Sequence, residues 1–317
     1  MKLREQLLHK NRVSFGPYMG VGLVLILLPL FLSPYLLYLA AKILILAIFA
    51  MGLNLILGYT GLVSMGHAAF FGIGAYTGAL IFKAWGLTPY FDMLMGGIFA
   101  SLSAVVLGII CLRMAPWALA IATVSFAEAM KILVINVPGL TEGAEGVGVL
   151  PIFGGGEAAR VKAYYLIFGI AFLCVLMAYL LKRSKLYYAF TAIHDDQEAA
   201  SMMGINPTKY KVMAFTISAF FVGVVGSFYA HYIAFIDPHS AFNVHISVES
   251  QIMPLMGGLY TVAGPVVGAF ILTLLGEYLR ITIKTGYLIV YGIILVVVIF
   301  YLPQGLVGLA GKWLKRK

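Results

Sequence analysis

Long apolar stretches recur along this chain and limit what it can fold into. A helix that crosses the hydrocarbon core of a bilayer needs about 20 mostly apolar residues, and such windows recur between Met19 and Pro303. Hydrophobic residues make up 62% of the 317 and charged residues only 10%, with a mean hydropathy of +1.00. Soluble globular domains are far more polar. The sequence therefore predicts an all-α, polytopic transmembrane helical bundle.

The apolar windows predict roughly 8–10 membrane spans. They cover residues 19–38, 40–57, 62–82, 93–111, 116–136, 164–181, 212–233, 247–258, 264–279 and 287–303. The windows at 247–258 and 264–279 are short, so at least one helix pair is short or broken. Glycine and proline mark the break between them. A single broken span there gives nine crossings. Two spans give ten and keep both basic termini on one side, which we favour.

Two polar interruptions, 137–163 and 182–211, are too short to form independent domains. We therefore expect one transmembrane domain over 1–317. Eight of the 21 basic residues lie near the two termini and five more in 182–211, whereas 137–163 carries three glutamates. By the positive-inside rule, the segments 1–18, 182–211 and 304–317 are cytoplasmic and 137–163 is external. The net charge of +9 thus points to the membrane surface and not to nucleic acid.

Small residues let helices approach closely in lipid. Gly74 and Gly78, like Gly264 and Gly268, have the G-x-x-x-G spacing. Packing within the subunit explains these pairs better than a dimer motif does. The two cysteines lie inside apolar windows, so we expect no disulfide framework and no metal site. No cofactor or catalytic group is indicated.

The chain has no phosphate-binding G-x-x-x-x-G-K-[ST] loop, which is the usual signature of a nucleotide-binding site. Uphill transport by this chain would need a partner ATPase or an ion gradient. We therefore expect a transport subunit with no enzymatic activity of its own.

The strongest local signal is a short helix in the 182–211 interruption. Asp195 is placed to cap it, Glu198 three residues later completes a capping-box pattern, and Gly204 and Pro207 end it. Its apolar residues suit docking into a cleft of another protein. A connector that rests on its own subunit is the alternative reading. The residues expected to couple this helix to an ATPase are Asp195, Glu198, Ala199, Ala200, Met203 and Gly204, with Met202 on the same apolar surface.

Several stretches carry a family resemblance. Residues 198–204 (EAASMMG) resemble the EAA loop of ABC importer permeases, although the downstream Ile-x-Leu-Pro part is missing. Residues 52–76 (GLNLILGYTGLVSMGHAAFFGIGAY) closely resemble the branched-chain amino acid ABC transporter permease family. Three further groups of residues match the same family: 123–128 followed by 141–146, 210–219 and 256–269. Together they span roughly residues 40–310, which is more specific than one motif. The chain is closer to the second of the two permeases in such systems.

The resemblance implies an importer in a bacterial or archaeal cytoplasmic (inner) membrane that moves branched-chain or related neutral amino acids inward. It also implies a homologous second permease, two cytoplasmic ATP-binding subunits and a periplasmic or extracellular solute-binding protein. Within the same family, urea or short amides remain alternative solutes, because specificity rests largely on the binding protein.

Ionisable residues inside spans are costly and often functional. Glu128 lies 12 residues into the span that begins at Pro116, about 18 Å along it. Ser125 and Lys131 share its helix face. Either Glu128 pairs with Lys131 against neighbouring helices, or it lines a solute pathway.

A second candidate pathway segment follows the second window. Its polar residues are Asn54, Thr60, Ser64 and His67. Three glycines there could interrupt a helix and expose backbone groups to a zwitterionic solute. A packed, hydrogen-bonded histidine is the alternative reading of His67. Glu249 and Gln251 begin a short span and are read as interfacial.

An ion-coupled secondary transporter is the competing hypothesis from a different class. It would use Glu128, Lys131 or His67 as a proton or ion site and would transport without ATPase partners. A membrane anchor or assembly role fits less well with the polar residues at span depth.

Overall fold

The computed structural model describes residues 22, 25–86, 88–112, 114, 116–283, 286–301 and 305–308. The predicted cytoplasmic segment 1–18 lies outside these residues, as does most of the predicted tail 304–317. What is described is almost entirely helical, so the prediction of an all-α transmembrane bundle is confirmed.

Seven described helices are long and apolar enough to cross a membrane. They are α3 (Pro34–Thr60), α4 (Ala68–Trp85), α5 (Pro89–Cys111), α6 (Pro116–Asn136), α8 (Glu157–Arg183), α11 (Pro207–Ile233) and α14 (Gly264–Ile283). Two shorter helices, α13 (Val244–Gly257) and α15 (Tyr287–Tyr301), belong to the same body.

Short elements precede or connect the long helices. They are η1 (Leu28–Leu30), α7 (Pro138–Thr141), η2 (Gly143–Glu145), β1 (Val147–Gly148), α9 (Lys185–Asp195), α10 (Gln197–Met202), β2 (Phe235–Ile236) and α12 (Pro238–Ala241). β1 and β2 pair antiparallel, with Val147 opposite Ile236.

The first helix boundary differs from the prediction. The windows 19–38 and 40–57 divide the chain near residue 39, but α3 runs unbroken from Pro34. The Ser33 side chain accepts a hydrogen bond from the Leu36 N–H, and Pro34 occupies the first helical position. Both are start signals that hydropathy does not register. The break therefore lies before Ser33.

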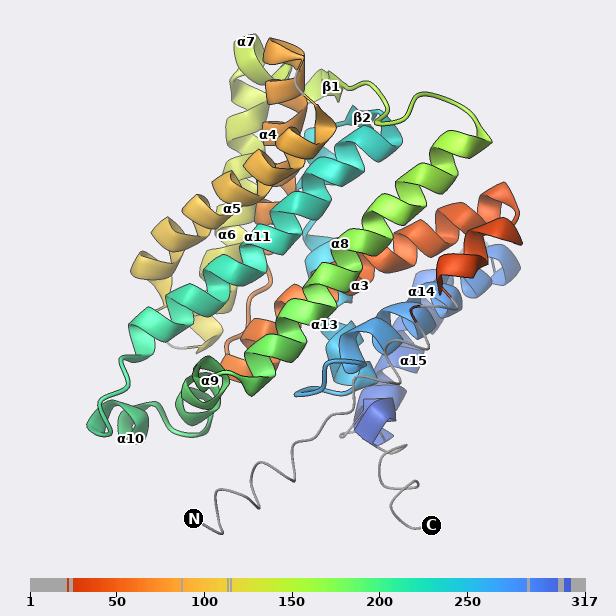
Figure 1. Ribbon diagram of the computed structural model, residues 1–317. Helices are drawn as coiled ribbons and strands as arrows, with labels where there is room; N and C mark the ends of the chain where they lie inside the picture. The colour runs from red at the N-terminus through yellow and green to blue at the C-terminus, as the bar shows by residue number, and fades with distance from the viewer. Residues whose placement is uncertain are drawn as a thin grey trace.

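Helix α11 lies in the middle of the bundle and packs against α3, α4 and α5, with α8 beside α3 (Figure 1). Fully buried phenylalanines such as Phe49, Phe70 and Phe215 fill this core. Close helix approach needs glycine: a Cβ on Gly74 would overlap the Gly223 carbonyl oxygen on α11. Gly78 likewise faces Ser227 of α11. This G-x-x-x-G pair thus packs within the subunit, as predicted.

Helices α13 and α14 form an antiparallel hairpin. A Cβ on Gly257 would overlap the carbonyl oxygen of Gly264, and one on Gly268 would overlap that of Met253. The chain thus reverses at residues 258–263, which resolves the two readings of this region in favour of two helices. Because α13 has only 14 residues, at about 1.5 Å per residue it is too short to cross a bilayer alone.

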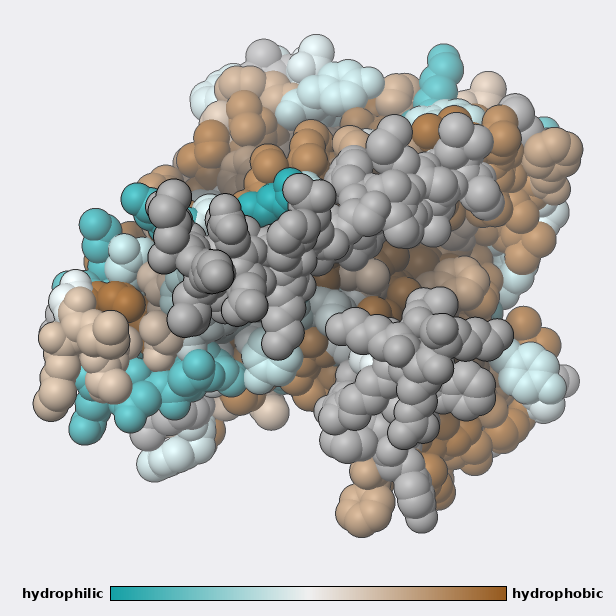
Figure 2. Space-filling model, turned by 60° about the horizontal axis from the view of Figure 1, so that its bottom comes forward, coloured by the Kyte–Doolittle hydropathy of each residue, from teal (hydrophilic) through white to brown (hydrophobic). Residues whose placement is uncertain are grey.

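The two ends of the bundle carry different elements. In Figure 1, α7, β1 and β2 lie at one end, and α9 and α10 lie at the other. Figure 2 shows hydrophilic residues gathered at the end that carries α9 and α10, while hydrophobic residues cover much of the flanks. This distribution is what a body with apolar sides and two wet ends requires.

Candidate functional site

Helices α3 and α4 are joined by a non-helical segment, residues 61–67. Helix α3 ends at Gly61, which has a left-handed φ of 70°. Along the segment, Leu62, Ser64 and Gly66 are buried, whereas Met65 is 37% exposed. Alternation of this kind is typical of extended chain. One side of the segment packs into the subunit and the other side is open.

His67 ends this segment inside the protein. Its ring lies between two hydroxyls, with Nδ1 2.8 Å from Ser64 Oγ and Nε2 3.0 Å from Ser218 Oγ. Ser218 lies 11 residues after the start of α11, which is about 17 Å along that helix. His67 therefore lies near half-depth. Both ring nitrogens have a partner, which agrees with the alternative reading of His67 as a packed, hydrogen-bonded histidine.

A second interruption lies at the same depth. The Ser247 hydroxyl, in the first turn of α13, accepts a hydrogen bond of 2.7 Å from the Ala68 N–H at the start of α4. Above α13, the ring of Phe242 stacks on Tyr76 of α4, with ring centroids 5.9 Å apart. The α12–α13 connection and the α3–α4 connection are thus two broken crossings that meet near the midplane.

Helix α6 presents an ion pair on an open face. Lys131 Nζ lies 2.5 Å from Glu128 Oε2, and the two side chains are 21% and 44% exposed. Ser125 is also exposed. The pair predicted from the sequence is formed, but neighbouring helices of this subunit do not bury it. The opposite side of α6 holds the extended segment, because Thr123 Oγ1 accepts a hydrogen bond from the Met65 N–H.

Asn54 and Thr60 lie inside the subunit on α3. The Asn54 side-chain amide donates to the Thr261 carbonyl at 3.2 Å, in the turn between α13 and α14. The Thr60 hydroxyl donates to the Ile56 carbonyl at 2.7 Å. Of the six candidate pathway residues, the structure brings Ser64 and His67 into contact. Ser125 and Glu128 are the two with substantial exposure.

The polar interruption 182–211 contains two short helices, α9 and α10, between the end of α8 and the start of α11. Asp195 does not cap α10, contrary to the prediction, because it is the last residue of α9. Asp196 takes that place: its Oδ1 accepts from the Glu198 N–H at 2.8 Å and from the Ala199 N–H at 3.0 Å. Glu198 is then the second helical residue, one position too early for a capping box.

The surface of α10 is divided between the subunit and open space. Ala200 is buried, whereas Ala199 is exposed and Met202 and Met203 are 89% and 81% exposed. Gly204 has a φ of 83° and ends the helix in the left-handed region, as the sequence indicates. An exposed methionine pair on a capped helix is an apolar surface that no other described residue covers.

Helix α9 links this region to the start of the α3–α4 connection and to the turn between α13 and α14. His194 Nε2 lies 3.0 Å from the hydroxyl of Tyr260, in the turn between α13 and α14. The Tyr260 carbonyl accepts a hydrogen bond of 2.8 Å from Lys182. Gly61 lies against the His194 ring, where a Cβ would overlap Nδ1. Tyr260 has a φ of 65°, a conformation that costs free energy in a non-glycine residue.

Sequence reasoning missed this junction and a buried pair at the other end. Asp92 and His231 are both fully buried, with Oδ2 and Nε2 3.4 Å apart. The His231 Nδ1–H can donate to the Leu150 carbonyl, 3.0 Å away. A detectable signal existed, because Asp92 lies in the first turn of one span and His231 in the last turn of another. In the part of the chain that the structure describes, no group of three metal-ligating side chains forms.

Interrupted helices that meet near the bilayer midplane are an architecture of membrane transport proteins, and this multi-pass chain is of that class. Its family follows from its sequence. The chain belongs to the family of branched-chain amino acid transport system permease components, whose profile matches residues 35–299. The expected family resemblance is confirmed.

Characterised relatives support this assignment. The chain is 30% identical over 307 residues to the high-affinity branched-chain amino acid transport system permease protein LivM of Salmonella typhimurium, covering 88% of this chain and 71% of the relative. The LivM protein of Escherichia coli K12 is 30% identical over 85% of this chain and 69% of its own length. The LivH permease of the same strain is 24% identical over 83% of this chain and 91% of its own length. No solved structure gives a significant match.

Proposed function

We propose that this chain is a membrane-spanning subunit of an ABC importer that moves branched-chain or related neutral amino acids into the cytoplasm. Its membership of the permease family carries this proposal. It would act with a homologous second permease, two cytoplasmic ATP-binding subunits and a solute-binding protein. The relatives named above are permeases of branched-chain amino acid systems, which favours this solute class over urea and short amides.

The proposed setting is a bacterial or archaeal cytoplasmic membrane, with α9 and α10 on the cytoplasmic side. The basic residues around α9 and α10 favour that side, because cytoplasmic loops carry an excess of Lys and Arg. Both termini would be cytoplasmic.

In this proposal α10 docks into a cleft of the ATPase. Ala199 and Met203, with Met202, form the contact, and Asp196 and Gly204 keep the short helix rigid at its two ends. Glu198 borders the contact with its exposed carboxylate, Asp195 joins α9 to α10, and Ala200 anchors the helix to the subunit. A docked α10 would act on the pore through α9, because α9 contacts Gly61 at the start of the α3–α4 connection and Tyr260 in the turn of the α13–α14 hairpin.

The proposed solute pathway runs along the open face of α6 and the open side of residues 61–67. A charged pair at membrane depth is expensive against lipid, so the face with Ser125 and Glu128 needs water, solute or the second permease beside it. Asn54, Thr60, Ser64 and His67 would shape this wall from behind by holding the extended segment and the turn of the α13–α14 hairpin.

Purification at native expression followed by reconstitution tests the proposal. We expect the second permease and two ATPase subunits to co-purify, and neutral amino acid uptake into proteoliposomes to require ATP and the binding protein. Uptake that a proton or sodium gradient drives in the absence of ATPase subunits would support the ion-coupled alternative instead. ATP-driven uptake of urea or short amides, without amino acid uptake, would correct the solute class.

A further inference from the structure

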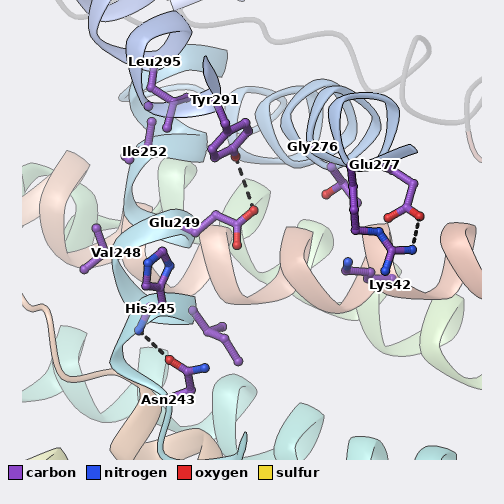
Figure 3. A pocket seen from close by; sticks show the side chains of 14 residues that line it. Lys42, Asn243, His245, Val248, Glu249, Ile252, Gly276, Glu277, Tyr291 and Leu295 are labelled. Carbon is purple, nitrogen blue, oxygen red and sulfur yellow. Dashed lines mark hydrogen bonds and ion pairs between the residues drawn. The ribbon is translucent and has the colours of Figure 1, made fainter. Parts of the chain in front are cut away.

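A cleft of about 540 Å³ lies between α3, α13, α14 and α15, and Figure 3 shows the side chains that line it. This volume is within the range of small-molecule sites. The cleft reaches from the second and third turns of α3 toward the level of the α3–α4 break. Lys42 is eight residues after the start of α3, about 12 Å along it. Glu249 follows Ser247, the α13 residue that meets Ala68 near the midplane.

Two of the charged side chains in the cleft neutralise each other. Arg280 donates to Glu277 Oε1 at 2.5 Å, and the same oxygen accepts a hydrogen bond from the Tyr35 hydroxyl at 2.5 Å. This pair and its tyrosine form a closed group on the α14 side of the cleft. It leaves no net charge for a ligand.

Two other charged side chains remain without an ion pair. Glu249 accepts one long hydrogen bond, 3.3 Å from the Tyr291 hydroxyl, and no cationic group of the described residues lies within ion-pair distance of it. No described carboxylate lies within ion-pair distance of Lys42 either, although Lys42 interacts with Glu277 over a longer distance. The cleft thus holds one cation and one anion that lack a close ion pair, at a depth where unpaired charge is costly.

A third polar group also lacks a partner. Thr273 lines the cleft and is only 4% exposed, yet its hydroxyl makes no hydrogen bond among the described residues. Buried hydroxyls are normally satisfied, so an exception calls for an explanation. The remaining wall includes the aliphatic side chains of Ile246, Ile252 and Leu295.

We propose that this cleft is a membrane-depth binding site for the translocated zwitterion. Lys42 binds the carboxylate, Glu249 binds the ammonium group, Thr273 supplies a hydrogen bond, and Ile246 and Ile252 hold the branched aliphatic side chain. Two opposite charges on separate helices discriminate a zwitterion from an amine or an acid of the same shape, because either analogue leaves one partly buried charge unpaired. This inference rests on the proposed function. It places the solute between α3, α13, α14 and α15, so it is an alternative to a pathway along the open face of α6.

Equilibrium binding to the complete importer in nanodiscs, without the binding protein, tests the site. The probe is radiolabelled L-leucine, with 3-methylbutylamine and 4-methylpentanoate as competitors that lack the carboxylate or the ammonium group. We expect Lys42→Met and Glu249→Gln each to weaken leucine binding by roughly ten- to hundredfold. Lys42→Met should lose the preference for leucine over the amine, and Glu249→Gln the preference over the acid. If the two residues had only a structural role, one variant would not lose the preference over the amine while the other loses the preference over the acid.

Two further variants guard against misfolding. Thr273→Val keeps the shape of the side chain, and we expect it to weaken binding severalfold without changing charge selectivity. Lys83→Met is the matched control, because Lys83 pairs with Glu142 at the end of the bundle that carries α7, and it should bind leucine as the wild type does.

ATP-driven uptake with the binding protein runs in parallel and separates the two proposals. If the wild type takes up amino acids and all three cleft variants keep unchanged affinity and selectivity, the cleft site is wrong and the proposed function stands. Loss of a co-purifying phospholipid from Lys42→Met, with leucine binding intact, would also overturn it and assign the cleft to a lipid head group. Absence of amino acid uptake by the wild type would overturn the proposed function and the cleft site with it.

Discussion

Replacing Gly204 tests whether α10 must be rigid to work. Gly204 has a φ of 83°, and no atom lies within 4 Å of the position that a Cβ would take. Gly204→Ala therefore adds no clash, and its whole cost is the left-handed backbone, about 1–2 kcal/mol. In a local equilibrium between a formed and a frayed helix end, that cost corresponds to a factor of about 5–30. A β-branched residue there is more strained, so Gly204→Val should act more strongly.

The chain offers a matched control at Gly86, which ends α4. Its φ is 59°, and a Cβ there also has nothing within 4 Å. Gly86→Ala thus carries the same kind of strain at a site remote from α10. In proteoliposomes with the partner subunits and binding protein, we expect the Gly204 variants to lose solute-stimulated ATP hydrolysis and uptake together, and Gly86→Ala to retain both. Full uptake by Gly204→Val at wild-type abundance would show that α10 is only a connector.

Three further predictions concern neighbouring parts of the same account. Asp196→Ala should cost about 1 kcal/mol of α10 stability and reduce coupled uptake, whereas Asp195→Ala should do neither; equal effects on uptake would refute the assigned cap. Glu128→Gln should strand the Lys131 cation and lower assembly, measured by size-exclusion yield, and Glu128→Gln/Lys131→Met should recover it. Normal assembly with defective uptake in Glu128→Gln would instead indicate a pathway role. Tyr260→Phe removes the hydrogen bond to the α9 histidine, worth about 1 kcal/mol. We expect ATP hydrolysis in this variant to depend less on solute uptake. Unchanged coupling between hydrolysis and uptake would exclude this contact as a link between α10 and the pore.

The sequence predicted the helical bundle well because span length and apolar composition are local properties. It failed at boundaries that depend on capping. Asp195 and Asp196 are adjacent, and only the end of α9 decides which of them caps α10. Helix α9 was not predicted, because it lies in a polar interruption. Its residues Ala189, Phe190 and Ile193 nevertheless have the spacing of a buried helix face, and all three are buried.

The polar groups that meet across the bundle could not be found in this way. Lys42 and Glu249 lie more than two hundred residues apart, and the cleft exists only because the α13–α14 hairpin packs on α3. Glu249 was read as interfacial because it begins a short apolar window. In the structure Ser247, two residues before Glu249, accepts a hydrogen bond from Ala68 at the start of α4, so Glu249 lies close to the level of the α3–α4 break.

Site-specific cross-linking of α10 tests the central claim most directly. The two native cysteines, Cys111 and Cys174, are buried and can be replaced, after which Met202→Cys provides one exposed thiol. We predict that this thiol cross-links to the ATP-binding subunit in the assembled importer, that the yield changes with the nucleotide bound, and that impermeant reagents reach it only from the cytoplasmic side. Labelling from the outside, or a thiol that never cross-links to an ATPase in an actively transporting complex, would contradict the account.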